Sequence, residues 1–145
     1  MSAPRPGCGL YIKWINEAIA AEANRNLKRH NLTMSQCHVL MALFRREERS
    51  ASLKELEGMF GVSQPTMAGL AARLEAKGLI TGFADPRDRR VKLVRLTEAG
   101  LTICQASHQE IMATEERITD ALSSEERALF LDMLRRIHDS LRLQP

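Results

Sequence analysis

The chain has 145 residues and a net charge of +3, which suits one compact domain, or one domain with helical extensions. Aromatic residues make up only 4% of a sequence that is 44% apolar, so the core has to be built from aliphatic and methionine side chains, as in helix-rich proteins. We expect no membrane span, because no run of about 18 uncharged apolar residues occurs.

The first two helices are predicted from apolar spacing and from a capping motif. A leader, residues 1–9, is rich in Pro and Gly, lacks a signal-peptide run, and is expected to be flexible on a cytoplasmic protein. Residues 10–29 then carry apolar side chains at helical intervals. Thr33 and Gln36 form a capping-box pattern, which predicts a second helix that ends in the charged segment RREERS.

Two short helices follow, joined by a tight turn. Ser52 and Glu55 form another capping box, and Gly61 is placed to end the helix that they begin. Ser63 caps the next helix, which has Pro in its first turn and stops at Gly78. The pair predicts a helix-turn-helix.

Two strands and two long helices complete the chain. The sequence predicts strands at residues 79–84 and 91–96, on either side of an arginine-rich turn. A helix to about residue 122 follows, and a Ser123–Glu126 capping box begins the last helix. This order predicts a mostly α fold with a small β-wing, a winged helix-turn-helix over residues 33–97. The helical regions 10–32 and 98–145 have wide apolar faces that so small a winged module cannot cover, so we expect them to form a homodimer.

Positive charge gathers in the predicted winged module. Residues 63–97 contain seven Lys and Arg against three Asp and Glu, whereas residues 98–145 contain five against nine. A localised basic segment is the electrostatic footprint of a polyanion site.

The second helix of a helix-turn-helix enters the DNA major groove with its N-terminal residues toward the bases. Gln can pair with adenine, and Thr can bond a phosphate or contact a thymine methyl group. The candidates are therefore Ser63, Gln64, Thr66, Met67 and Arg73. Helix capping and packing, or an ion pair for Arg73, are the alternative interpretations.

The turn between the strands holds five cations within residues 87–95, which a hairpin does not need for its own backbone. An arginine at a hairpin tip can enter a narrow minor groove. We assign Arg87, Arg89 and Arg90 to DNA, with Arg90 as the inserted residue and Arg89 as the alternative. Asp85 and Asp88 can fix the turn by accepting hydrogen bonds from the backbone and from the arginines. A solvated charged turn is the other interpretation.

The segment DPRDRR resembles the D-x-R-D-x-R wing signature of the MarR family of bacterial transcriptional regulators. The likeness extends to LTMSQCHVLMAL, RLEAKGLI and LTEAGL, and covers residues 10–142. It implies a homodimer joined by its first and last helices, a pseudo-palindromic operator, and a small, often phenolic ligand that weakens DNA binding. The sequence departs from the family at Cys37, where Trp is usual.

The resemblance also places Tyr11, Trp14, His38 and Met41 on the helices that border the family's ligand pocket. As a group they suit a planar acidic or phenolic ligand, while core packing is the alternative for each one. The three cysteines are dispersed, without a CxxC pair, and we expect reduced, inert thiols.

No hydrolase, nucleotide-binding or metal-binding motif stands out, so we expect no enzyme activity, cofactor or metal. The sequence thus predicts a ligand-responsive DNA-binding transcriptional repressor. A winged-helix protein-interaction module without DNA binding is the alternative.

Overall fold

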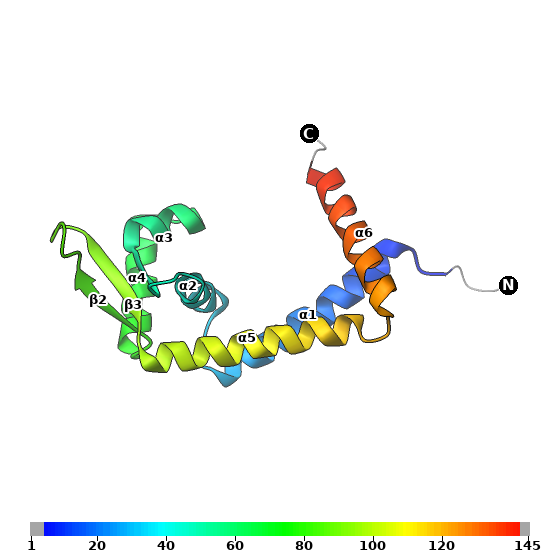
Figure 1. Ribbon diagram of the computed structural model, residues 1–145, viewed down its shortest axis with the longest axis horizontal. Helices are drawn as coiled ribbons and strands as arrows, with labels where there is room; N and C mark the ends of the chain where they lie inside the picture. The colour runs from blue at the N-terminus through cyan, green and yellow to red at the C-terminus, as the bar shows by residue number, and fades with distance from the viewer. Residues whose placement is uncertain (1–4, 143–145) are drawn as a thin grey trace. The chain divides into compact units, whose positions relative to one another are not determined.

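The computed structural model describes residues 5–142 and divides into two compact units, Met1–His108 and Gln109–Pro145 (Figure 1). The described part contains the six helices that the sequence predicted, together with three strands. In chain order they are α1 (Cys8–Arg29), α2 (Met34–Phe44), β1 (Ser50–Ser52), α3 (Leu53–Phe60), α4 (Gln64–Ala76), β2 (Ile80–Ala84), β3 (Lys92–Leu96), α5 (Glu98–Thr119) and α6 (Ser124–Arg142). None of these helices is long and apolar enough to cross a membrane.

α1 begins two residues before its predicted start. Cys8 and Gly9, which were assigned to the flexible leader, are therefore helical, while residues 1–4 of that leader lie outside the described residues. The capping box of α2 is confirmed. Thr33 Oγ1 accepts the Gln36 N–H at 3.2 Å, and Gln36 Oε1 accepts the Thr33 N–H at 3.2 Å.

Both helices of the helix-turn-helix start and stop where their sequence signals predicted. Ser52 and Glu55 exchange hydrogen bonds of 3.1 and 2.7 Å at the start of α3. Gly61 ends α3 with φ 60°, and Gly78 follows α4 with φ 71°. Glycine suits both positions because the left-handed region costs other residues free energy.

The predicted hairpin of β2 and β3 is antiparallel, and its last pair before the turn joins Ala84 and Lys92. A third strand was not predicted: β1 pairs with the other side of β3, which gives the sheet order β1-β3-β2. Its three residues leave the sequence no room for a strand pattern.

A single core fills the space between α2, α3, α4 and the sheet. The side chains that are almost completely buried include Val39, Leu40, Leu43, Leu56, Met67, Leu74, Ile80, Val94 and Cys104. α5 begins close against this body, since a Cβ on Gly100 would lie 2.0 Å from the Leu79 carbonyl oxygen. The core therefore holds the helix-turn-helix and the β2–β3 hairpin together as one body.

The second unit, from Gln109 onward, contains the end of α5 and all of α6. The third capping box is confirmed by bonds of 2.8 and 3.2 Å between Ser123 and Glu126. α6 has no buried residue among those described, and its exposed large apolar side chains are Leu129, Leu131, Met133, Leu134, Ile137 and Leu141. In the first unit α1 likewise buries none, and it exposes Leu10, Tyr11, Ile12, Trp14 and Ile15.

Candidate nucleic-acid interface

The N-terminal end of α4 presents polar side chains to solvent. Ser63 caps the helix, with its Oγ 3.4 Å from the Thr66 N–H nitrogen and 2.9 Å from Thr66 Oγ1. Ser63, Gln64 and Thr66 are all exposed. Free backbone N–H groups and the helix dipole make this end attractive to anions.

Met67 lies on the other side of α4, and the prediction that it faces DNA is wrong. Its side chain is 0% exposed and belongs to the core together with Ala71 and Leu74. The outer side of the helix instead carries Ala68 and Ala72, both exposed. Neither alanine was among the predicted site residues, although both follow Gln64 at intervals of four residues, the spacing of one helical face.

Arg73 is also exposed, and within residues 5–142 it forms no salt bridge. The alternative of an intramolecular ion pair is therefore absent from the described part of the chain. Its guanidinium is available to an external acceptor.

The wing tip is built by two carboxylates. Asp85 Oδ1 accepts the Arg87 N–H at 2.9 Å and lies 3.7 Å from the Arg87 Nε. Asp88 accepts the Arg90 N–H at 3.0 Å, and its two oxygens lie 3.2 and 3.3 Å from Arg90 Nε and Nη2. Both aspartates thus make the backbone and arginine contacts that the sequence predicted.

Two backbone bonds close the same turn. The Asp85 N–H donates to the Val91 carbonyl, and the Val91 N–H donates to the Asp88 carbonyl, both at 2.9 Å. The guanidinium of Arg90, followed by its backbone N–H, lowers the pKa of the Asp88 carboxyl below its ordinary value. The side chain of Arg90 is nevertheless 92% exposed, so it is oriented without being covered.

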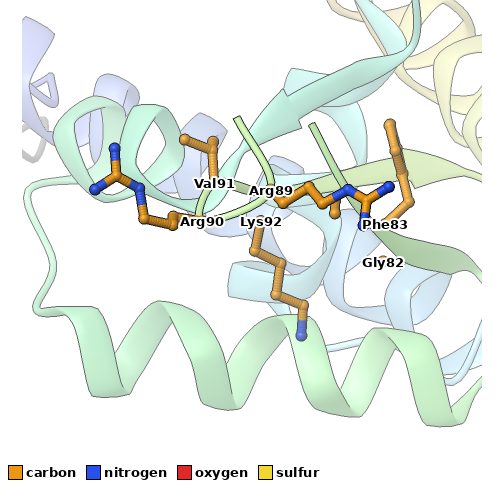
Figure 2. Close-up of a pocket in the computed structure, with 7 residues that line it drawn as sticks. Gly82, Phe83, Arg89, Arg90, Val91 and Lys92 are labelled. Carbon is orange, nitrogen blue, oxygen red and sulfur yellow. The ribbon is translucent and has the colours of Figure 1, made fainter. Parts of the chain in front are cut away.

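Cations lie on both sides of the wing. Figure 2 shows Arg89 and Arg90 pointing in opposite directions from the tip, with Arg89 extending toward Phe83. Both line a shallow depression of about 340 Å³ together with Phe83 and Lys92. Arg95 stacks on Phe83, with its Cζ 4.7 Å from the ring centroid. The hairpin therefore offers several guanidinium groups to a polyanion.

The side chain of Glu75 adds a hydrogen bond between the wing and α4 to their shared core packing. The Gly82 N–H, on the free edge of β2, donates to Glu75 Oε1 at 2.8 Å. Because Glu75 belongs to α4, this bond helps to hold the helix and the hairpin as one unit. Their relative placement matters if both are to meet the same duplex.

The four residues assigned to a ligand pocket are only partly brought together. Tyr11 and Trp14 form an edge-to-face pair, with ring centroids 5.7 Å apart on α1. His38 is exposed on α2, whereas Met41 is buried in the core, which is the alternative interpretation for that residue.

The cysteines differ in exposure. Cys8 is exposed, Cys37 half-buried and Cys104 buried. Burial raises the pKa of the Cys104 thiol to about 11, so little thiolate forms there at neutral pH.

The fold and this surface define a winged helix-turn-helix protein, with an open helix start beside an arginine-rich hairpin. The family model for MarR matches residues 32–92. The HTH-type transcriptional repressor NicR of Pseudomonas putida is 35% identical over 109 residues, which cover 75% of this chain and 68% of NicR. The chain belongs to the MarR family.

Two other relatives show how far the likeness extends. The HTH-type transcriptional regulator YxaD of Bacillus subtilis is 35% identical over 88 residues, 61% of this chain, and the match spans 62% of the length of YxaD. The fold is shared with MepR of S. aureus, solved in complex with DNA. That match has a TM-score of 0.71 and 23% identity, and it covers 94% of this chain and 99% of MepR.

Proposed function

We propose that this protein is a sequence-specific DNA-binding transcriptional regulator that acts as a repressor. The observation that carries the proposal is the wing tip, where Asp88 orients the exposed guanidinium of Arg90 beside a recognition helix tied to the same hairpin. Membership of the MarR family and the repressor NicR support it. The same membership supports the expectation that the chain is not an enzyme.

In this proposal α4 lies in the major groove and the wing reaches the minor groove. Gln64 and Thr66 face base edges, Ser63 and the helix start bind phosphate, and Arg73 reaches the backbone. The small side chains of Ala68 and Ala72 allow close approach and fit thymine methyl groups. Arg90 enters the minor groove, and Arg87 and Arg89 bind flanking phosphates.

The active form is a homodimer that binds a pseudo-palindromic operator. The exposed apolar side chains of α1 and those of α6 form two separate faces, each of which a second copy would cover. The family resemblance supports a small aromatic effector that lowers operator affinity by favouring another separation of the recognition helices.

Replacing Arg90 by Ala tests the proposal. We expect Arg90→Ala to weaken binding to a duplex selected by the wild type from a random DNA library by more than about tenfold, since the homodimer loses one inserted arginine at each half-site. Arg25→Ala, which removes an exposed cation of α1, serves as the charge control. Fluorescence anisotropy gives the affinities, and sedimentation velocity reports whether the dimer persists.

Salt dependence separates DNA binding from the protein-interaction alternative. The logarithm of the wild-type affinity should fall steeply and linearly with the logarithm of salt concentration, because each phosphate contact releases counterions. A flat response, or equal affinities for Arg90→Ala and the wild type, would contradict the assignment of the wing.

A further inference from the structure

The C-terminal end of α4 is bonded to the turn between α1 and α2. Lys77 follows the last helical residue, and its backbone N–H donates to the carbonyls of Arg73 and Glu75. Its ammonium group donates to the Asn31 carbonyl and, at 2.9 Å, to Gln36 Oε1. One side chain therefore connects the recognition helix to a segment more than forty residues away in sequence.

Both acceptors of Lys77 are held in place by other contacts. Asn31 adopts a left-handed conformation with φ 53°, in the tight turn that follows α1. Gln36 is only 3% exposed, and its Oε1 also accepts the Thr33 N–H of the α2 capping box. A carbonyl oxygen has two lone pairs, so the capping bond and Lys77 together use the full capacity of this buried atom.

The turn at Asn31 is also joined to α1. The Leu32 N–H donates to the Leu27 carbonyl at 2.9 Å, and both side chains pack on the core. α1 carries an exposed apolar face at its other end, with Trp14 and Ile15 among its members. The contacts of Lys77 thus lie between a surface assigned to the second copy and the helix assigned to DNA.

We propose that Lys77 is a positioning residue that fixes α4 relative to α1 and so sets the half-site spacing that the homodimer accepts. The proposal rests on the proposed function. Two recognition helices must meet successive major grooves about one helical turn of DNA apart, so a change in the angle of α4 changes the preferred spacing. Lys77 itself need not touch DNA.

The measured quantity is the preferred half-site spacing, in addition to the affinity. If Lys77 contributed only to general stability, its replacement would leave this preferred spacing unchanged. The probes are the duplex that the wild type selects from a random library, the same duplex with one or two base pairs inserted or removed at its centre, and a single half-site. Lys77→Met removes the side-chain donors and keeps the aliphatic stem, and Lys77→Arg keeps side-chain donors. Lys28→Met, the control, removes an exposed cation on the last turn of α1. Lys77→Leu, which also lacks side-chain donors, is used if Lys77→Met does not fold.

We expect Lys77→Met to lose about tenfold in affinity for the selected duplex, the usual scale for a charge-assisted hydrogen bond, and to discriminate less among spacings. Its affinity for the single half-site should stay within about twofold of the wild type. Lys77→Arg should restore the spacing optimum, and Lys28→Met should keep it.

The proposal is overturned if Lys77→Met retains the wild-type spacing profile. It is also overturned if the affinity loss is equal on the half-site and on the selected duplex, because Lys77 would then act through charge or general stability. If the wild type selects no duplex at all, the proposed function fails together with this inference. That result is distinct from an unchanged spacing profile.

Discussion

At the scale of single residues, the acidic side chains of the wing contact the arginines that the proposed function assigns to DNA. Asp88 lies in the most basic part of the chain and would repel phosphate on Coulombic grounds alone. Its oxygens are occupied by the backbone and guanidinium of Arg90, so the carboxylate restricts the arginine to one direction. Orientation of a flexible cation reduces the entropy lost on binding.

Asp88→Ala separates orientation from charge. We expect this variant to bind the selected duplex about three- to tenfold more weakly, because the freed Arg90 must be ordered when it enters the groove. Asp120→Ala, which removes an exposed carboxylate outside the wing, is the matched control. Anisotropy titrations at one salt concentration measure both, and tighter binding by Asp88→Ala would show that charge dominates.

Cys104 provides a pH prediction. Its thiol has a pKa of about 11 in the folded chain against an ordinary 9.0, so its contribution to stability is complete below pH 9. Between pH 9 and 11 the unfolded chain loses the proton first, and stability falls by about 2 kcal/mol. Chemical denaturation under reducing conditions should show this fall in the free energy of unfolding between pH 9 and 11 in the wild type and in Cys8→Ala. This contribution to the pH dependence should be absent in Cys104→Ala.

At the scale of elements, identical substitutions should have opposite effects at two glycines. Gly100→Ala would place a methyl group 2.0 Å from the Leu79 carbonyl oxygen, and we expect a loss of at least about 2 kcal/mol. A Cβ on Gly69, in the middle of α4, meets nothing within 4 Å, so Gly69→Ala should stabilise by about 0.5–1 kcal/mol. Thermal denaturation measures both, and a neutral Gly100→Ala would contradict the close packing of α5.

The helices could be predicted because their signals are local. Each capping box joins residues three apart, so Thr33, Ser52 and Ser123 identified helix starts without knowledge of the fold. β1 could not be predicted, since its strand character depends on pairing with β3, far along the chain. The inward direction of Met67 depends on which side of α4 meets the core, and the first turn alone does not fix that.

At the scale of the whole molecule, the apolar faces of α1 and α6 remain exposed on a single chain. We expect Ile137→Asp on α6 to convert the dimer to a monomer and to lower affinity for the selected duplex by at least about tenfold, since one half-site contact is lost. Ala128→Glu, also on α6 and half a turn away around the helix, is the control. Sedimentation velocity gives the oligomeric state, and a dimeric Ile137→Asp would place the interface elsewhere.

The bare outer side of α4 has a consequence for how such a protein can diversify. Ala68, Gly69 and Ala72 contribute no long side chains there, and the buried stripe of Met67, Ala71 and Leu74 holds the helix without them. Substitution of Ala68 or Ala72 can therefore introduce a longer polar side chain without disturbing the buried side of the helix. If α4 reads the operator as proposed, copies of the gene can acquire new genomic targets through such substitutions.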